Sequence, residues 1–370
     1  MSESLKRLLI VGQTPPPWHG QGVATKMLVD HEWSDWEVDF VRMAYSDGID
    51  AVGKFQWRKI GHLFQLTREV RQKLKASPGT VMLYPPSSAH WLPFLRDVYF
   101  LIRTRKLARG TAFIFHASGL PAFVKKSRLR SWLARLAYHG ADISLEVAQE
   151  KITAKEVFGA RESAWCPCAA EIPELPPKPS RNRHVCTALF VGSLMEGKGV
   201  FEILRTAKVM KDGGMQKVRF VIVGKWSDQD FQRECKTFVE EHELGEWVDF
   251  RGQLTGDAKW EAFREADLFF FPSHYSSEAS PIVLMEALGA GLPVVSTLWA
   301  GIPAMVGECE AVNLCAIQKP EEFAEAISLT IRNREEASRL SVVAEEFFRQ
   351  RYTPEHFIKR IEAGLAKAGL

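Results

Sequence analysis

One stretch decides the fold: Ala188-Leu189-Phe190-Val191-Gly192-Ser193-Leu194-Met195-Glu196-Gly197-Lys198-Gly199-Val200-Phe201-Glu202-Ile203-Leu204. Its first four residues predict a buried strand, its glycines predict a tight loop, and the spacing of its last apolar residues predicts a helix. Backbone N–H groups and the positive end of a helix converge at such a loop, where Lys198 adds a full charge. The stretch therefore predicts a strand-loop-helix unit that holds a phosphate.

The same loop matches the first seven positions of a Walker A motif, but Gly199 stands where a Ser or Thr should bind Mg²⁺. Without that hydroxyl the loop lacks a metal ligand that phosphoryl transfer from ATP requires. The sequence therefore disfavours a nucleotide triphosphatase. A tight turn whose glycines only let the helix pack remains an alternative.

Similar units extend on both sides of this stretch. Short runs of Val, Ile and Phe alternate with longer segments of helical period, which is typical of a parallel sheet with crossover helices. The predicted strands cover residues 8–11, 38–41, 81–84, 112–115 and 142–145, and then 187–191, 219–223, 247–250, 268–271 and 293–296.

Between the two series, four prolines and a polar tail predict a linker at 170–184. A chain of 370 residues also exceeds the usual size of one hydrophobic core. We expect an α/β protein with two doubly wound, Rossmann-like domains, 1–169 and 185–351, that face each other across a cleft. An amphipathic helix is expected over 352–370, and the sequence leaves open whether it packs on the first domain.

Composition is that of a soluble globular protein, with 46% hydrophobic and 25% charged residues. No apolar run is long enough for a membrane span, and the N-terminus lacks a cleavable signal pattern, so a cytoplasmic protein is expected. Six scattered cysteines favour free thiols. The spacing of Cys166 and Cys168 is too tight for a zinc knuckle, and we expect neither a metal nor a cofactor.

Charge is unevenly distributed along the chain. Residues 1–180 hold 25 Lys and Arg against 17 Asp and Glu, whereas the remainder holds 23 against 28. Residues 91–109 and 125–132 combine aromatic side chains with clustered cations. These stretches predict peripheral contact with the anionic inner face of a membrane. No nucleic acid is expected as a partner. Core-facing helices with basic outer faces are the alternative.

Two glutamates follow the predicted strand 268–271. Ser280 can cap a helix whose first residue is Pro281, which places Glu278 in the loop before the helix and Glu286 within it. Glu278 lies near the positive end of the helix and can orient a polar ligand. Glu286 has apolar neighbours, so its carboxylate requires a partner such as a pair of hydroxyl groups.

The spacing of these glutamates, with Glu-Ala-Leu-Gly-Ala-Gly-Leu-Pro-Val-Val over 286–295, resembles the retaining glycosyltransferases of family four, which adopt the GT-B fold. The resemblance runs from Val185 to Val306 through landmarks at 197–199, 221–224, 248–252, 278–286 and 300–303. It implies a transferase that moves a sugar from a nucleotide-diphosphate donor to a glycan or lipid-linked acceptor in cell-surface polysaccharide or glycoconjugate synthesis.

The resemblance also implies roles for individual residues. Lys198 would contact the donor diphosphate, Glu286 the ribose, and Glu278 the hydroxyls of the transferred sugar. In the first domain, a glycine loop with Gly20 and Gly22 ahead of a helix near Val23 would approach the donor phosphates, and His116 would line the sugar pocket. The remaining expected donor contacts are Gly192, Ser193, Arg251, Gly252, Ser280, Pro281, Ile282 and Val283.

One departure concerns Ser193, because family members often carry Arg at this place. Losing that cation would remove on the order of 3 kcal/mol from the transition state unless Arg251 or Lys225 replaces it. The expected chemistry is a metal-free transfer in which a phosphate oxygen takes the acceptor's proton. A nucleotide-sugar epimerase of the same architecture and a catalytically silent nucleotide-sugar-binding partner are the alternatives.

Overall fold

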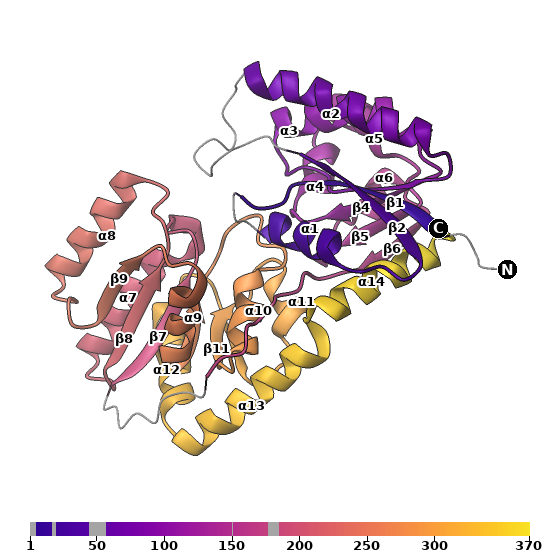
Figure 1. Cartoon of the computed structure of the whole chain (residues 1–370). Helices are drawn as coiled ribbons and strands as arrows, with labels where there is room; N and C mark the ends of the chain where they lie inside the picture. The colour runs from indigo at the N-terminus through magenta and orange to yellow at the C-terminus, as the bar shows by residue number, and fades with distance from the viewer. Residues whose placement is uncertain (1–4, 17–19, 44–56, 150, 177–184) are drawn as a thin grey trace. The chain divides into compact units, whose positions relative to one another are not determined.

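A computed structural model describes residues 5–16, 20–43, 57–149, 151–176 and 185–370 (Figure 1). The chain divides into two compact units. The first comprises Met1–Cys168 together with Pro354–Leu370, and the second comprises Ala169–Thr353. Each unit is built around one six-stranded sheet in which every pairing is parallel.

In the first unit the strand order is β2-β1-β3-β4-β5-β6. The strands are β1 (Lys6–Gly12), β2 (Trp36–Arg42), β3 (Val81–Tyr84), β4 (Gly110–Phe115), β5 (Ile143–Glu146) and β6 (Glu162–Trp165). The helices are α1 (Gly20–Asp30), α2 (Trp57–Ala76), α3 (Trp91–Thr104), η2 (Arg105–Leu107), α4 (Leu120–Lys125), α5 (Arg128–Tyr138), α6 (Ala154–Phe158) and α14 (Pro354–Lys367).

In the second unit the order is β12-β11-β10-β7-β8-β9. The strands are β7 (Cys186–Val191), β8 (Val218–Val223), β9 (Val248–Gly252), β10 (Leu268–Phe271), β11 (Val294–Thr297) and β12 (Val312–Cys315). The helices are η3 (Glu196–Lys198), α7 (Val200–Asp212), α8 (Gln229–Glu241), α9 (Gly256–Glu265), α10 (Ile282–Gly289), α11 (Ile302–Val306), α12 (Pro320–Ile331) and α13 (Arg334–Arg351).

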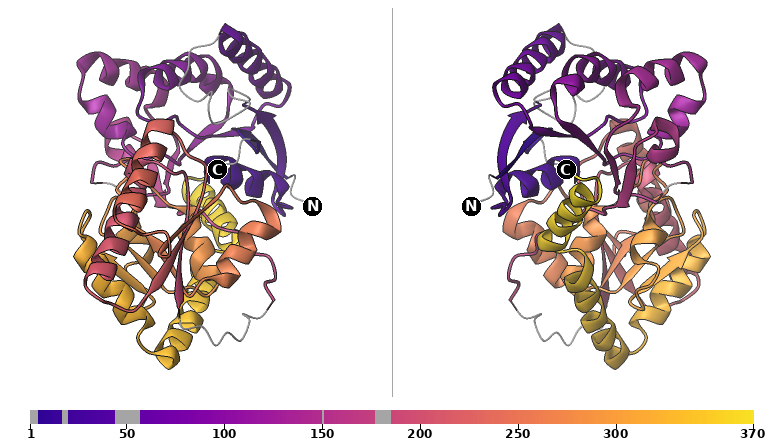
Figure 2. Two further views of the ribbon diagram at one scale, coloured as in Figure 1. Left: turned by 90° about the vertical axis from the view of Figure 1, so that its left-hand side faces the viewer. Right: turned by 90° about the vertical axis from the view of Figure 1, so that its right-hand side faces the viewer.

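Both sheets are doubly wound. The chain moves one way from the first strand of each sheet and then returns to build the other side, so right-handed crossovers place helices on both faces. Figure 2 shows the second unit's sheet nearly edge on, with helices on either side. This arrangement confirms the predicted fold class of two Rossmann-like domains.

The predicted strands are all present. β3 and β10 match their predicted limits, and the other strands differ at one or both ends by one or two residues, but the edge strands β6 and β12 were missed. Glu162-Ser163-Ala164-Trp165 and Val312-Asn313-Leu314-Cys315 mix polar with apolar residues and stay partly exposed. An edge strand has one hydrogen-bonded neighbour, so it lacks the continuous apolar run that marks a central strand.

The first unit's core contains a buried carboxylate. Asp97 on α3 is fully buried and accepts hydrogen bonds from the hydroxyls of Tyr84 (2.8 Å) and Tyr138 (3.0 Å) and from the N–H of Ser87 (2.7 Å). Arg96 adds an ion pair at 3.0 Å. Burying a charge is tolerated where it is paired and hydrogen-bonded in this way, so Asp97 joins α3 to β3 and α5.

The C-terminal helix α14 belongs to the first unit and lies against β5 and β6. Gly364 makes the close approach possible, since a Cβ there would lie 2.6 Å from the Leu145 side chain. Lys367 pairs with Glu162 at 3.2 Å, and the Lys6 ammonium donates to the Leu370 carbonyl at 2.9 Å. The helix therefore covers the β5–β6 side of a sheet whose strands lie about 200 residues or more earlier in the sequence.

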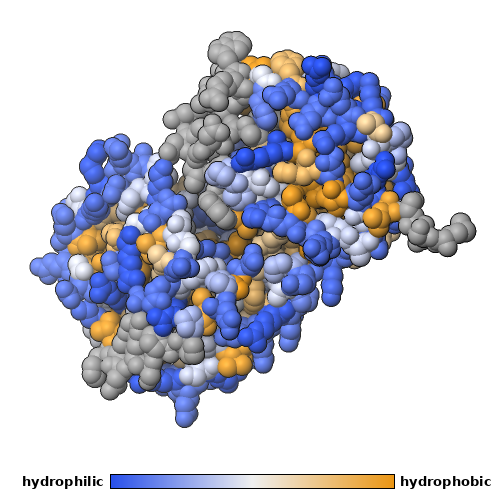
Figure 3. Space-filling view, viewed as in Figure 1, coloured by the Kyte–Doolittle hydropathy of each residue, from blue (hydrophilic) through white to orange (hydrophobic). Residues whose placement is uncertain are grey.

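Most of the surface seen in Figure 3 is hydrophilic, and the largest hydrophobic area in that view lies on the first unit. No helix in the described part of the chain is both long and apolar enough to cross a membrane.

Candidate active site

The second unit's strand order reverses between β7 and β10, which are neighbours in the sheet. This place is the switch point of the second sheet. Crossovers from these two strands leave in opposite directions, so the loops at their carboxyl ends part and form the usual ligand crevice of a doubly wound sheet. The loops are residues 192–199 and 272–281. They contain Gly192, Ser193, Lys198, Glu278, Ser280 and Pro281 among the predicted site residues.

The loop after β7 packs directly on the loop after β10. Gly199 has φ of 77° and precedes α7, and a Cβ there would lie 2.1 Å from the Pro272 carbonyl oxygen. The N–H of His274 donates to the Gly197 carbonyl at 2.9 Å. Both the left-handed backbone and the close approach require glycine at position 199. Gly199, which breaks the Walker A pattern, is therefore required by the backbone conformation and the packing of this loop.

Lys198 and Glu278 meet at this junction. The Lys198 ammonium lies 2.6 Å from Glu278 Oε2, which also accepts from the Ser273 hydroxyl at 2.6 Å. The side chains are 19% and 6% exposed, so the pair is largely shielded from water. The ammonium also lies 5.0 Å from the centre of the Tyr275 ring. Two predicted catalytic residues, 80 positions apart in sequence, therefore form one charged unit.

Side chains and backbone after β11 fix the loop that carries Glu278. The Gly301 N–H donates to the Glu278 carbonyl at 3.0 Å, and the Thr297 hydroxyl donates to the Ser273 carbonyl at 2.6 Å. The Trp299 indole donates to the Tyr275 carbonyl at 2.9 Å. Sequence reasoning placed Gly301 within a family landmark but missed the other two, because their role depends on contacts between separate loops.

The helix after Glu278 begins one residue later than predicted. Pro281, and not Ser280, occupies the N-cap of α10, and no side chain caps it. Pro281 has extended backbone with φ of −66° and ψ of 108°, and its carbonyl accepts from the Leu284 N–H at 3.0 Å. The first turn of α10, with Ile282 and Val283, still opens toward the switch point, where a helix N-terminus favours an anion.

Glu286 lies in the middle of α10 and has a cationic partner. Lys259 on α9 places its ammonium 2.5 Å from Glu286 Oε1, and the side chains are 22% and 14% exposed. Burial raises the pKa of Glu286 above its ordinary range, and the ion pair with Lys259 opposes part of that rise. Lys259 was missed because no motif links a lysine to a glutamate 27 residues later.

The candidate replacements for the family's arginine are placed differently. Arg251 pairs with Asp249 at 3.1 Å and with Glu265 at 2.9 Å, so two carboxylates already neutralise its guanidinium. Lys225 follows β8, and its carbonyl accepts from the Leu194 N–H at 2.9 Å in the phosphate loop. Lys225 therefore belongs to a segment that touches this loop, whereas Arg251 is engaged elsewhere.

Gly252 ends β9 with φ of 70°, and its carbonyl accepts from the Gly224 N–H at 2.8 Å. This hydrogen bond joins the ends of β8 and β9. A Cβ on Gly224 would lie 1.8 Å from the Gly192 carbonyl oxygen, so the phosphate loop packs closely on the end of β8. The backbone of three successive strand ends is thus held together without side chains.

In the first unit the glycine loop differs from the prediction. Gly20 and Gly22 form the first turn of α1, which begins at Gly20 and not near Val23, and residues 17–19 lie outside the described part. His116 follows β4 and is half-buried, and its Nδ1 lies 3.7 Å from Cys168 Sγ. Within the described residues no group of three or more His, Cys, Asp or Glu side chains could hold a metal ion.

A known protein family matches most of the second unit. Residues 171–347, a little under half of the chain, match the family described as glycosyl transferases group 1. The matched segment contains Lys198, Lys259, Glu278 and Glu286.

Relatives of known sequence align with a part of the chain. The putative colanic acid biosynthesis glycosyltransferase WcaL of Escherichia coli is 31% identical over 121 residues, which cover 31% of this chain and 29% of the relative. The amylovoran biosynthesis glycosyltransferase AmsK of Erwinia amylovora is 29% identical over 144 residues, which cover 38% of this chain and 33% of the relative. The chain thus spans about a third of the length of these relatives.

Solved structures resemble the whole chain. HepE of Anabaena, in complex with UDP and glucose, has a TM-score of 0.69 at 16% identity and covers 98% of this chain and 100% of its own. The lipopolysaccharide outer core galactosyltransferase WaaB has a TM-score of 0.67 at 13% identity, covering 98% and 99%. At these identities the likeness concerns the fold alone, and it confirms the GT-B class predicted from sequence.

Proposed function

We propose that the protein is a cytoplasmic, retaining glycosyltransferase that moves a sugar from a nucleoside-diphosphate sugar to a glycan or lipid-linked acceptor. The product would be a cell-surface polysaccharide or glycoconjugate. The family match of residues 171–347 and the names of the relatives support this proposal. The observation that carries it is the shielded pair of Lys198 and Glu278 at the switch point of the second sheet.

Each charged group at this switch point suits one part of the donor. A diphosphate can draw the Lys198 ammonium from Glu278, because it offers more negative charge at the same distance. The first turn of α10 adds the positive end of a helix for the distal phosphate. Glu286 can accept hydrogen bonds from the two ribose hydroxyls, and Glu278 can accept them from the sugar.

The proposed reaction breaks the bond between the sugar's anomeric carbon and the diphosphate oxygen. A bond from the acceptor oxygen forms on the same face, and the acceptor's proton passes to the departing diphosphate oxygen. Lys198 and the first turn of α10 stabilise the charge that develops on the leaving group. One such contact contributes about 3 kcal/mol in a site that excludes water.

The first unit would supply the acceptor side. We assign Gly20 and Gly22 in the first turn of α1 to the approach toward the donor phosphates, and His116 to the sugar pocket. A basic first unit also fits peripheral contact with an anionic membrane, from which a lipid-linked acceptor would be drawn. Exclusion of water from the bound donor would limit hydrolysis.

Product analysis tests the proposal. The protein is incubated with UDP-, GDP- and ADP-sugars, with and without acceptor extracts, and nucleotide and sugar products are followed. Nucleotide release that depends on acceptor, with an α-linked product from an α-linked donor, is the expected result. Isomerised donor, or binding without turnover by any donor and acceptor, would instead identify an epimerase or a silent binding protein. Lys236→Met on the exposed face of α8 serves as the control for Lys198→Met.

A further inference from the structure

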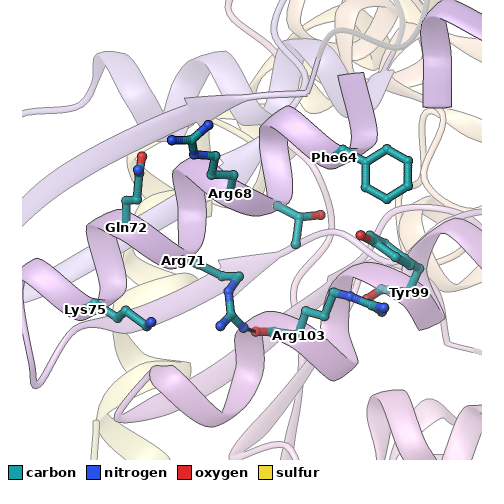
Figure 4. Close-up of a pocket in the computed structure, with 8 residues that line it drawn as sticks. Phe64, Arg68, Arg71, Gln72, Lys75, Tyr99 and Arg103 are labelled. Carbon is teal, nitrogen blue, oxygen red and sulfur yellow. Dashed lines mark hydrogen bonds between the residues drawn. The ribbon is translucent and has the colours of Figure 1, made fainter. Parts of the chain in front are cut away.

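A cavity of about 600 Å³ lies between α2 and α3 of the first unit (Figure 4). None of the residues assigned to the donor or the sugar lines it. Its lining is formed by Phe64, Thr67, Arg68, Arg71, Gln72, Lys75, Tyr99 and Arg103.

Four of the eight lining residues are cationic and none is acidic. The Arg103 guanidinium lies 3.7 Å from the centre of the Tyr99 ring, and Arg71 donates a hydrogen bond to the Arg103 carbonyl. These contacts restrain two guanidinium groups at one end of the cavity, while Arg68 and Lys75 extend from α2 (Figure 4). Fixed guanidinium groups match the geometry of phosphate oxygens, so the cavity suits a phosphate.

The charge around the cavity has the same sign. Between residues 57 and 138 the sequence holds 16 Lys and Arg against two acidic residues, Glu69 and Asp97. Asp97 is fully buried and paired within the core, so it contributes little to the surface potential. Eleven of the 16 cations belong to α2, α3 and α5. Their excess concentrates anions at the surface of these helices.

The same three helices carry exposed apolar side chains. Of the thirteen large apolar residues that are exposed in the described part of the chain, eight lie on them: Phe64, Trp91, Leu92, Leu95, Ile102, Leu129, Trp132 and Leu136. On α3 and α5 they recur at helical spacing and form one stripe on each helix. The Phe64 ring meets the Tyr99 ring edge to face at 5.4 Å, so the apolar surface continues to the cavity.

Cations beside an exposed apolar stripe are the pattern of helices that lie in a membrane interface. We propose that the cavity between α2 and α3 binds the phosphate of an anionic phospholipid, while the stripes of α3 and α5 enter the headgroup boundary. A soluble phosphate compound would need the cations but not the apolar stripes. This site deepens the membrane contact of the proposed function and rests on it.

Vesicle sedimentation of the full chain tests the site. The wild-type protein is expected to bind vesicles of phosphatidylcholine with phosphatidylglycerol at low salt and to bind phosphatidylcholine alone far more weakly. Arg68→Gln/Lys75→Gln removes two exposed cations of α2 and should weaken binding about 30-fold, since each cation near an anionic surface strengthens association about five-fold. The control is Arg233→Gln/Lys236→Gln on α8, which removes the same charge from an exposed face.

A second pair of variants tests the apolar stripe. Leu92→Ala and Leu329→Ala shorten side chains that are 54% and 59% exposed, so neither should affect folding. Leu92→Ala is expected to weaken vesicle binding several-fold, and Leu329→Ala on α12 is expected to leave it unchanged.

Several results would overturn the site: no binding to anionic vesicles at low salt, equal losses in the α2 and α8 double variants, or equal behaviour of the two leucine variants. Protection by inorganic phosphate in a thermal-shift assay without any vesicle binding would also overturn the lipid assignment. Nucleotide release with a water-soluble acceptor is measured in parallel, because the α2 variant should retain it. If the wild-type protein releases no nucleotide with any acceptor, the proposed transferase is refuted, and the lipid site is not.

Discussion

Removing the charge of Lys198 should lower both stability and activity, and a second substitution at Glu278 should restore the stability alone. In Lys198→Met the Glu278 carboxylate would remain buried with the Ser273 hydroxyl as its side-chain donor. Breaking one side of a buried ion pair costs roughly 3–5 kcal/mol. Because the lysine keeps 19% exposure, we expect the lower end, about 3 kcal/mol. For a unit of this size that corresponds to a fall in Tm of roughly 6–12 °C.

The double variant Lys198→Met/Glu278→Gln removes the stranded charge. A glutamine can still accept from Ser273, and a neutral pair of similar volume is often as stable as the ion pair it replaces. Calorimetry should therefore find the Tm of the second unit's transition close to that of the wild type. Acceptor-dependent nucleotide release should not recover, because the cation on the leaving group is absent in both variants.

The expected loss of kcat/KM is about 100-fold or more, which corresponds to about 3 kcal/mol of transition-state stabilisation. A wild-type Tm in Lys198→Met would refute the buried pair. Near-wild-type turnover by the stable double variant would refute the assignment of Lys198 to the diphosphate, whatever the Tm values.

Three further predictions concern other contacts. Burial raises the pKa of Glu286, so lowering the pH should protonate this carboxylate already above the ordinary glutamate range and remove the acceptor for ribose. Donor affinity measured by calorimetric titration should therefore decrease as the pH is lowered, and Glu286→Gln should abolish this pH dependence. Gly301→Ala would place a Cβ 1.8 Å from the Ala279 carbonyl, and we expect a loss of roughly 1–3 kcal/mol and weaker donor binding, whereas Gly245→Ala, with open space around it, should change neither. Asp97→Asn should lower the Tm of the first unit's transition, since two tyrosine hydroxyls lose a charged acceptor worth about 3 kcal/mol, and unchanged unfolding would show that the network contributes nothing to stability.

Strand positions were predictable where burial is complete. The limits of β3 and β10 match their predicted limits to the residue, because Val81-Met82-Leu83-Tyr84 and Leu268-Phe269-Phe270-Phe271 consist of aliphatic and aromatic residues throughout and are fully buried. In the second unit the candidate loops followed from the same pattern, since each comes directly after a central strand. Edge strands and helix starts were less accessible, because half-exposed residues and a proline at an N-cap leave several registers of similar energy.

Partners of charged side chains were the least predictable part. Lys198 and Glu278 could each be assigned to the site, but not to one another, because their contact depends on how the loops after β7 and β10 pack. Lys259 illustrates the same limit, since it belongs to no motif and reaches Glu286 from α9. Tertiary packing decides such pairs, and a local pattern contains no information about them.

These two pairs have a common consequence for donor binding. Each of the two carboxylates assigned to the donor forms an ion pair with a lysine, Glu278 with Lys198 and Glu286 with Lys259. A donor that binds these carboxylates must therefore replace the lysines as their partners. When the diphosphate takes the Lys198 ammonium, the Glu278 carboxylate becomes available as an acceptor for the sugar's hydroxyls. Diphosphate and sugar would then strengthen each other's binding through one ion pair. A nucleoside diphosphate without its sugar leaves Glu278 buried and poorly satisfied, so the complete donor should bind more tightly than its diphosphate fragment in the wild type, and Glu278→Gln should reduce that difference.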